Sequence, residues 1–178
     1  MKNFLIFILT IVFITSCSTE DELDKITVEV TASDVAGTWK VNEFYLQNGK
    51  ISTTIQGIPT TANLELDGKD FNTTITFVQN PNTVTSNGSF TVVTKVSYFT
   101  FSYSEEYEEN ININGQWSIA DNVLSISESG ITQNFEIVEF TGNTIKVKQQ
   151  FDEDFNNIDG YSGQATGTLY IGFNKTSQ

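Results

Sequence analysis

The stretch Val35-Ala36-Gly37-Thr38-Trp39-Lys40-Val41 marks the point where a polar, irregular segment gives way to sustained strand-like alternation. A glycine at the start of a strand lets the backbone bend sharply or approach another segment closely. A tryptophan two residues later offers a large apolar surface for closing the end of a small core. We therefore expect Gly37 and Trp39 to close one end of a β domain.

The chain that follows alternates apolar and polar side chains between frequent turn signals, and no helix of useful length is expected in it. Asn48-Gly49 and Asp67-Gly68 predict turns. The acidic runs 104–110 and 152–160 predict loops. The pattern predicts an all-β domain of about eight to ten antiparallel strands, either an up-and-down barrel or a sandwich.

Composition limits the function. The chain has 178 residues with a net charge of −13, nine lysines and no arginine or histidine. This charge argues against nucleic acid as a partner, because phosphate binding needs clustered Lys and Arg. The absence of histidine removes the commonest general base and the commonest zinc ligand. The one cysteine excludes an internal disulfide and a multi-cysteine metal cluster.

The first residues have the features of a secretion signal. Met1-Lys2-Asn3 is a short basic start, and the apolar run Phe4 to Ile14 is too short to span a bilayer comfortably. The run ends in Ile14-Thr15-Ser16-Cys17, which resembles the lipobox of bacterial lipoproteins. This resemblance implies cleavage before Cys17 and acylation of its thiol.

We therefore expect a signal peptide over residues 1–16, a lipid-anchored acidic linker over 17–34 and a barrel domain over 35–176. Acylation with two or three chains anchors a protein far more firmly than a single chain does. Ser18 after the cysteine resembles the sorting signal of outer-membrane lipoproteins. The expected location is the outer membrane of a Gram-negative bacterium, on its periplasmic face or at the cell surface.

Gly37-Thr38-Trp39-Lys40 resembles the first-strand motif of lipocalins, and more closely that of lipocalin-like domains in bacterial lipoproteins. Three later regions resemble the same domains: Thr76-Phe77 with Asn82-Thr83-Val84, Gly115 to Ile119 with Asn122 to Ile126, and Phe135 to Val138 with Thr144 to Lys148. The resemblance implies a lipocalin-like barrel. Vertebrate-type lipocalins pack an arginine over the motif tryptophan, and here Lys175 is the candidate for that place.

Two acidic regions carry side chains of the kinds found in chemical sites. Glu105, Glu106, Glu108 and Glu109 surround Tyr107, but a solvated hairpin tip explains them better than a pair of catalytic carboxylates. Asp152 to Asp159 has the oxygen ligands of a calcium loop without the glycine and glutamate of an EF-hand. We expect no catalytic residue, no cofactor and no metal, and calcium is the one ion left to test.

Aromatic residues are frequent and fall at alternating strand positions. One interpretation is a barrel cavity for an apolar ligand, lined by Phe77, Phe99, Phe101, Trp117, Phe135 and Phe151. The other is a barrel packed solid with the same side chains. Periodicity identifies inward faces but does not distinguish a packed interior from a hollow one.

The sequence thus predicts a non-enzymatic lipoprotein whose domain binds a small apolar or amphipathic molecule. The alternative is a structural, interaction or adhesion domain with a filled core. The membrane, reached through the N-terminal lipid, is the expected partner, and the oligomeric state is left open.

Overall fold

The computed structural model describes residues 29–158 and 161–176. The predicted signal peptide, Cys17 and most of the predicted linker lie outside these residues. Within them, no helix is long and apolar enough to cross a bilayer. The elements are α1 (Ala32–Val35), β1 (Gly37–Ile55), β2 (Ile58–Lys69), β3 (Thr74–Val78), β4 (Thr83–Asn87), β5 (Ser89–Tyr98), β6 (Phe101–Asn110), β7 (Asn114–Ala120), β8 (Val123–Glu128), β9 (Ile131–Phe140), β10 (Thr144–Ile158) and β11 (Tyr161–Lys175).

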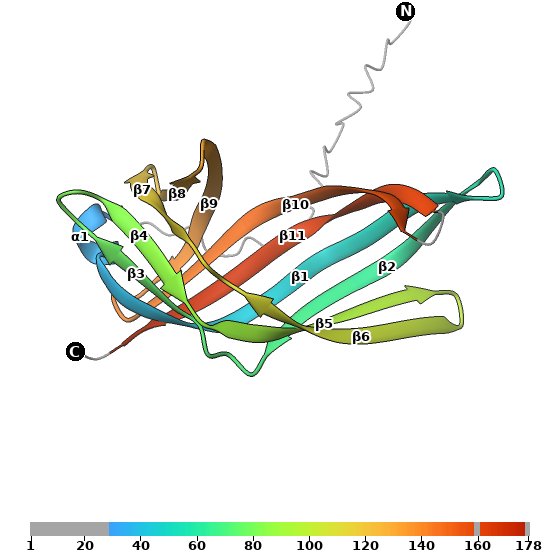
Figure 1. The fold of residues 1–178 in the computed structure, drawn as a ribbon, viewed down its shortest axis with the longest axis horizontal. Helices are drawn as coiled ribbons and strands as arrows, with labels where there is room; N and C mark the ends of the chain where they lie inside the picture. Colours follow the sequence, from blue (N-terminus) through green and yellow to red (C-terminus); the bar gives the residue numbers. More distant parts are fainter. Residues whose placement is uncertain (1–28, 159–160, 177–178) are drawn as a thin grey trace, which may run out of the picture.

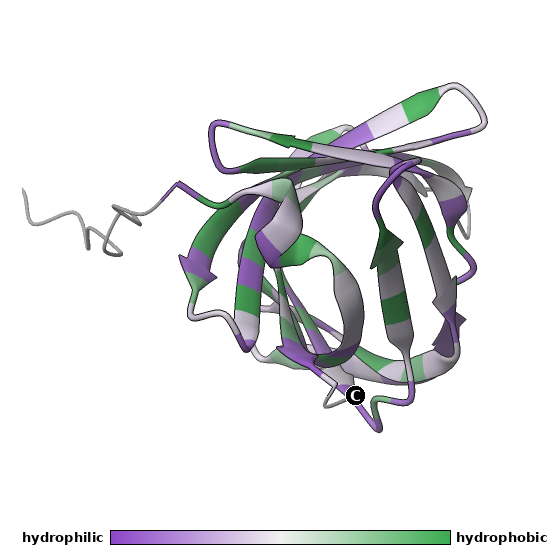
Figure 2. Cartoon of the chain, turned by 90° about the vertical axis from the view of Figure 1, so that its left-hand side faces the viewer, coloured by the Kyte–Doolittle hydropathy of each residue, from purple (hydrophilic) through white to green (hydrophobic). Residues whose placement is uncertain are grey.

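Eight of these strands form a closed antiparallel barrel. Their order is β1-β3-β4-β7-β8-β9-β10-β11, and β11 returns to pair with β1 from Trp39↔Lys175 onward. Figure 2 looks into the end of the barrel that carries α1. Closure leaves no free edge in this part of the sheet. The predicted all-β, antiparallel up-and-down barrel is confirmed.

Three strands of the barrel are bent, so each is counted as two. β2 continues into β3, β4 into β5, and β6 into β7, while β1 pairs first with β3 and then with β2. The bends lie side by side, since Asn72 N donates to Ser89 O and Ile111 N donates to Gly88 O. Gly88 has φ +106°, and a Cβ there would lie 1.9 Å from Asn72 O. No other residue fits this bend without moving the backbone.

Beyond the bends the barrel opens. We call this part the open sheet: residues 45–55 of β1, 58–69 of β2, 89–98 of β5, 101–110 of β6, 149–158 of β10 and 161–170 of β11, in the order β10-β11-β1-β2-β5-β6. β9 pairs with β10 only as far as Lys148, and β8 and β9 reverse into each other at Ser129-Gly130. Among the described strands none therefore bridges β10 and β6, and Figure 1 shows the open sheet extending away from α1.

Two predicted turns are wrong, because they lie within strands. Asn48 has φ +56°, but β1 continues through Gly49 without reversing. The pairing of β1 with β11 and with β2 shifts in register at this point. A Cβ at Gly49 would lie 2.2 Å from Leu64 O, so the glycine serves a close backbone approach. Gly68 pairs with Val92 inside β2, and the ring of Phe71 fills the space beside it. The first reversal of the chain comes later, at Gln56-Gly57.

The two acidic runs predicted as loops are also strands. Residues 104–110 belong to β6, which pairs with β5 from Tyr98↔Phe101 to Ser89↔Asn110. Residues 152–158 belong to β10, while 159 and 160 lie outside the described residues. Carboxylates are common on edge strands because they oppose pairing with another chain. The many acidic residues in these runs therefore mark the edge strands of the open sheet and do not mark turns.

The main core fills the closed barrel. Its buried members come from the segment before β1 and from all eight barrel strands: Val30, Val35, Trp39, Val41, Ile75, Phe77, Val84, Trp117, Leu124, Phe135, Ile137, Ile145, Val147 and Phe173. Val30 is 3% exposed and belongs to the region predicted as linker. The buried core therefore begins before residue 35, within the region predicted as linker.

Candidate functional site

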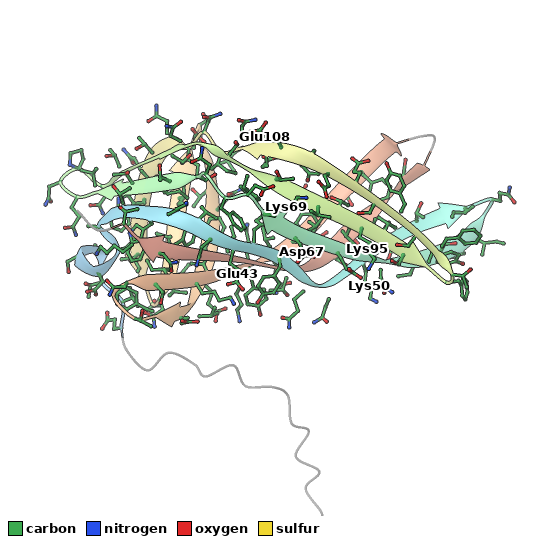
Figure 3. All side chains as sticks on the ribbon, turned by 90° about the horizontal axis from the view of Figure 1, so that it is seen from below. Glu43, Lys50, Asp67, Lys69, Lys95 and Glu108 are labelled. Carbon is green, nitrogen blue, oxygen red and sulfur yellow. The ribbon has the colours of Figure 1, made fainter. Side chains whose placement is uncertain are left out.

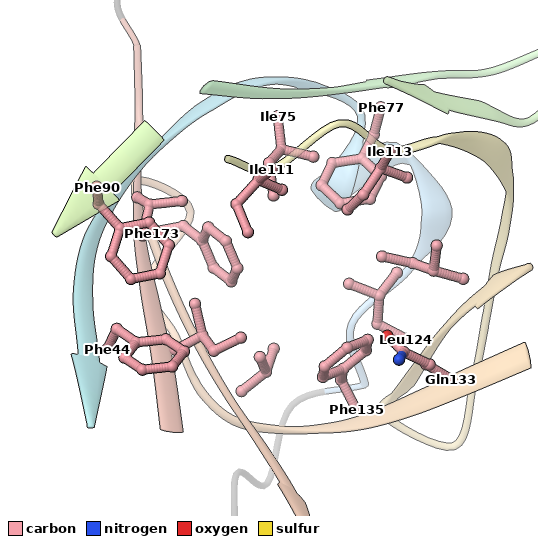
Figure 4. Close-up of a pocket in the computed structure, with 14 residues that line it drawn as sticks. Phe44, Ile75, Phe77, Phe90, Ile111, Ile113, Leu124, Gln133, Phe135 and Phe173 are labelled. Carbon is pink, nitrogen blue, oxygen red and sulfur yellow. The ribbon is translucent and has the colours of Figure 1, made fainter. Parts of the chain in front are cut away.

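The barrel encloses a cavity of about 150 Å³ next to this core. Its lining is apolar except for Gln133, and Figure 4 shows the labelled side chains converging on the space. The lining residues are Val41, Phe44, Ile75, Phe77, Phe90, Ile111, Ile113, Leu124, Ile126, Gln133, Phe135, Val147, Ile171 and Phe173. No ionisable side chain is among them. The site is suited to a small uncharged group and offers no acid–base chemistry.

Strand alternation and one bulge position this lining. Phe173 and Ile171 are two residues apart on β11, and they pair with Val41 and Phe44 of β1. Val41 and Phe44 are three residues apart, and both point inward because the register shifts between Val41 and Glu43. The bulge places the centre of the Phe44 ring 5.0 Å from the centre of the Phe90 ring. It therefore places an aromatic pair where the barrel meets the open sheet.

The cavity opens beside β8 and β9. Gln133 is exposed and pairs with the half-buried Ile126 across these two strands. Deeper residues such as Phe135 and Val147 are buried. The lining thus grades from an exposed amide at the mouth to a dry apolar interior.

The opposite end of the barrel is closed by α1 and Trp39. Trp39 is fully buried, and its Nε1 donates to Val35 O over 2.7 Å. Val35 is also fully buried, and Val30 N donates to the side chain of Asn122 at the β7–β8 turn. This hydrogen bond fixes the segment before β1 across the barrel end. The structure places Trp39 at this end of the barrel, and its predicted role in closing the barrel stays a prediction.

Lys175 and Gly37 complete the closed end. The Nζ atom of Lys175 lies 5.0 Å from the centre of the Trp39 ring, where the resemblance to lipocalins placed a cation. Gly37 has φ +130°, and a Cβ there would lie 3.1 Å from Lys175 Cε. A side chain at position 37 would strain the backbone and displace the lysine.

Three of the predicted lining residues lie inside the barrel. Phe77 and Phe135 line the cavity. Trp117 is buried but does not line it. Its ring packs edge-on against Phe77 at 5.3 Å, and its Nε1 donates to Val78 O. Trp117 therefore packs on the side of Phe77 that faces away from the cavity and supports that part of its wall.

Three other predicted lining residues lie outside the cavity. Phe99 and Phe101 are 89% and 77% exposed at the β5–β6 reversal, and Phe151 is half-buried in the part of β10 that belongs to the open sheet. Placing Phe99 and Phe101 inside the barrel was wrong. The strands that would have covered them, β8 and β9, are too short to reach the end of the open sheet.

Sequence reasoning missed Phe44, Phe90, Ile111 and Ile113 as lining residues. Phe90 starts a strand whose alternation is visible, so it could have been found from the pattern. Phe44 follows Val41 by three residues, and this break in the two-residue spacing is a sequence signal for the bulge that turns it inward. Ile111 and Ile113 lie in the bend between β6 and β7, held by Ser86, whose hydroxyl donates to Ile111 O.

The proposed calcium region forms no cluster in the described residues. Asp152 lies on β10 and accepts a hydrogen bond from Gln164 over 2.8 Å. Across residues 29–158 and 161–176, no group of three or more His, Cys, Asp or Glu is placed to hold a metal ion. Asp159 and Gly160 lie outside the described residues.

A cluster of charged and aromatic side chains lies on the outer wall of the barrel. Lys146 makes an ion pair with Glu43 at 2.9 Å, and its Nζ lies 5.1 Å from the centre of the Tyr45 ring, which stacks on Tyr170. Burial opposes the charged form, but hydrogen bonds to Glu43 and Tyr45 outweigh it and raise the pKa of Lys146. This cluster braces β1, β10 and β11 without entering the cavity.

A closed, antiparallel eight-stranded barrel with an apolar interior defines the class of calycin-type barrel proteins. The family model of the lipocalin-like domain matches residues 35–147, which is more than half of the chain. The chain belongs to the lipocalin-like domain family, whose members are generally non-enzymatic. No curated protein and no solved structure matches the chain. The matched residues end in β10, before β11 closes the barrel.

Proposed function

We propose that this chain is a lipid-anchored, non-enzymatic lipoprotein whose barrel binds a small apolar or amphipathic molecule. The observation that carries the proposal is the cavity of about 150 Å³ with a lining that is apolar except at its mouth. An apolar cavity of this size, lined by Leu, Ile and Phe, stays dry and accepts a benzene-sized molecule. The ligand group that enters the barrel is therefore an aromatic ring or a short alkyl end.

The anchor part of the proposal rests on the sequence. The basic start, the apolar run Phe4 to Ile14 and the sole cysteine at position 17 support processing and acylation. The described chain begins at the closed end of the barrel, beside α1. A tether from Cys17 would join that end and leave the open sheet facing away from the anchor. We infer that the protein resides at the outer membrane.

A second candidate function is protein interaction or adhesion. It is favoured by the exposed apolar residues at the far end of the open sheet, where Ile58, Phe99 and Phe101 are 66%, 89% and 77% exposed. Patches of this kind mark interaction sites more often than scattered apolar residues do. The cavity, in contrast, supports ligand binding, which therefore remains the first proposal.

The binding test is a titration of the chain from residue 17 onward, carrying Cys17→Ser, with the neutral apolar dye N-phenyl-1-naphthylamine. Ile126→Phe places a ring in the cavity mouth, and we expect it to weaken dye binding about tenfold, or 1.4 kcal/mol. Ile131→Phe is the matched control, because the same change at this 69% exposed residue of β9 leaves the cavity untouched.

Saturable binding that is lost in Ile126→Phe and kept in Ile131→Phe supports the proposal. No binding by the parent chain, or equal binding by all three proteins, would show that the barrel interior is not the site. Circular dichroism of each protein checks that the barrel remains folded.

A further inference from the structure

The cavity does not end at the barrel but continues onto the inner face of the open sheet. Phe44 and Phe90 line the cavity, and alternation along their strands brings Leu46, Val92 and, across β2, Leu64 to the same face. These three residues are 7%, 1% and 6% exposed. An unbroken apolar surface therefore leads from the barrel interior out along β1, β2 and β5.

The same face becomes aromatic and exposed toward β6. Tyr107 pairs with Val92, and Tyr103 pairs with Val96. Tyr107 and Tyr103 are 44% and 63% exposed. Among the described strands, none pairs with the outer edge of β6. The inner face of the open sheet is thus a long apolar surface with one accessible, aromatic side.

Charge is divided between the two faces of the open sheet. Lys69 pairs with Glu106 at 2.7 Å and Lys95 with Glu65 at 2.9 Å on the outer face, where Lys50 also contacts Asn63. Figure 3 labels Lys50, Lys69 and Lys95 with other residues of this outer face. Across the described residues of the open sheet no lysine points inward, whereas Glu105, Glu109 and Glu153 do by register. The inner face disfavours an anionic ligand and attracts a cationic one.

β6 presents phenol rings and carboxylates alternately on this face. Tyr103, Glu105, Tyr107 and Glu109 share one side of the strand, and the Tyr103 hydroxyl donates to Glu105 over 2.7 Å. Glu109 pairs directly with Phe90, so its carboxylate lies beside a residue that lines the cavity. Rings and carboxylates together are the groups that hold ammonium and quaternary ammonium ions.

We propose that the cavity and the inner face of the open sheet form one site for a cationic amphiphile, a molecule with one apolar tail and an amine or quaternary ammonium head. The tail enters the barrel past Phe44 and Phe90, and the head lies against Tyr107 and Glu109. Longer ligands reach Glu105, four residues or about 14 Å further along β6. The inference rests on the proposed function, since it needs a cavity that accepts an apolar group.

The test compares three ligands with the same ten-carbon tail: decyltrimethylammonium, decanol and decanoate, each below the concentration at which it aggregates. The protein is the chain from residue 17 onward with Cys17→Ser, which retains every described residue. Calorimetry at about 150 mM salt screens attraction from distant charges. We expect decyltrimethylammonium to bind about tenfold more tightly than decanoate.

Two double variants locate the head group. Glu105→Gln with Glu109→Gln removes the inward carboxylates, and we expect about a tenfold loss of affinity for decyltrimethylammonium with decanol unchanged. Glu106→Gln with Glu108→Gln makes the same charge change on the outward face of the same strand, and we expect less than a twofold effect. Equal losses in both variants would mean that the overall negative charge of the chain attracts the cation nonspecifically, and would overturn the inference.

The remaining outcomes separate the inference from the proposed function. If decanol binds but decyltrimethylammonium binds no better than decanoate, the cationic site fails and the apolar cavity stands. If no ligand binds, both fail. Light scattering on the same samples reports a second copy packed on the open sheet, and a stable dimer that excludes the ligands would overturn the inference.

Discussion

Trp39 is the residue on which the closed end of the barrel depends. It is fully buried between α1 and Lys175, donates to Val35 O and pairs in the strand ladder with Ile75 and Lys175. One side chain thus joins the segment before β1, the first strand and the last strand. Because the last strand is far from the other two parts in the sequence, Trp39 contributes to closure as well as to apolar burial.

We expect Trp39→Ala to lower the free energy of unfolding by about 3–5 kcal/mol, the usual cost of removing a large buried aromatic side chain. Urea melts of the chain from residue 17 onward with Cys17→Ser measure this loss. Lys40→Ala, at the exposed neighbouring position on β1, is the control and should change stability by less than about 0.5 kcal/mol. A loss below about 1 kcal/mol for Trp39→Ala would contradict its role in closing the barrel.

At the scale of elements, α1 shows how a four-residue helix can be held in place. The Asp34 carboxylate accepts hydrogen bonds from the Thr31 hydroxyl at 2.6 Å and from Thr31 N at 2.9 Å. These bonds, with a smaller contribution from Lys175, lower the pKa of Asp34. The helix is too short to be stable alone, so its cap and the burial of Val35 fix it over the barrel end.

The lowered pKa of Asp34 predicts a pH dependence. The ionised carboxylate favours the folded state, so its contribution is complete above the unfolded value of about 3.9 and is lost as pH falls through the lower folded value. We expect Asp34→Ala to cost about 0.5–1 kcal/mol at pH 7, as for other helix caps, and less at pH 3. Urea melts at both pH values provide the measurement.

Glu139→Ala, which removes an exposed carboxylate from β9, is the control for this series. It should change stability little at either pH. If Asp34→Ala costs as much at pH 3 as at pH 7, the carboxylate is not what holds α1.

At the scale of the whole molecule, one set of strands makes two different surfaces. Where β7, β8 and β9 are present the sheet closes and encloses the cavity, and beyond them it opens and exposes one apolar face. The closed half carries the described start and end of the chain, and the open half lies away from both (Figure 1). A membrane tether at the closed half would leave the open half accessible to a ligand.

The proposed tether predicts the behaviour of the precursor. Cys17→Ser should abolish incorporation of labelled fatty acid and leave the signal peptide uncleaved, because the thiol accepts the lipid before cleavage in proteins with this motif. Radiolabelled palmitate and the mobility of the band on a gel report the two effects. Ser16→Ala keeps a small residue at the cleavage site and serves as the control, and normal labelling of Cys17→Ser would exclude the lipoprotein assignment.

The sequence by itself determined the fold class and much of the core. Alternation placed Trp117, Leu124, Phe135 and Phe173 on apolar faces that are buried in the barrel. The reversals at Asp121-Asn122 and Ser129-Gly130 consist of residue types that favour turns. These features depend on neighbours in the chain, so a local pattern is enough to reveal them. The buried place of Trp39 was visible for the same reason.

The tertiary structure alone decided which apolar faces are covered. Phe135 and Phe101 have similar alternating surroundings, yet one is buried and the other is 77% exposed. Phe135 lies on β9 within the closed barrel, whereas Phe101 starts β6 at the far end of the open sheet, where β8 and β9 do not reach. Likewise Asn48-Gly49 is a pair that favours turns, but it lies within β1, where the backbone at Gly49 closely approaches Leu64 O of β2. Burial, cavities and bulges depend on strands that meet from distant parts of the chain, and alternation along one strand contains no information about the length of its neighbours.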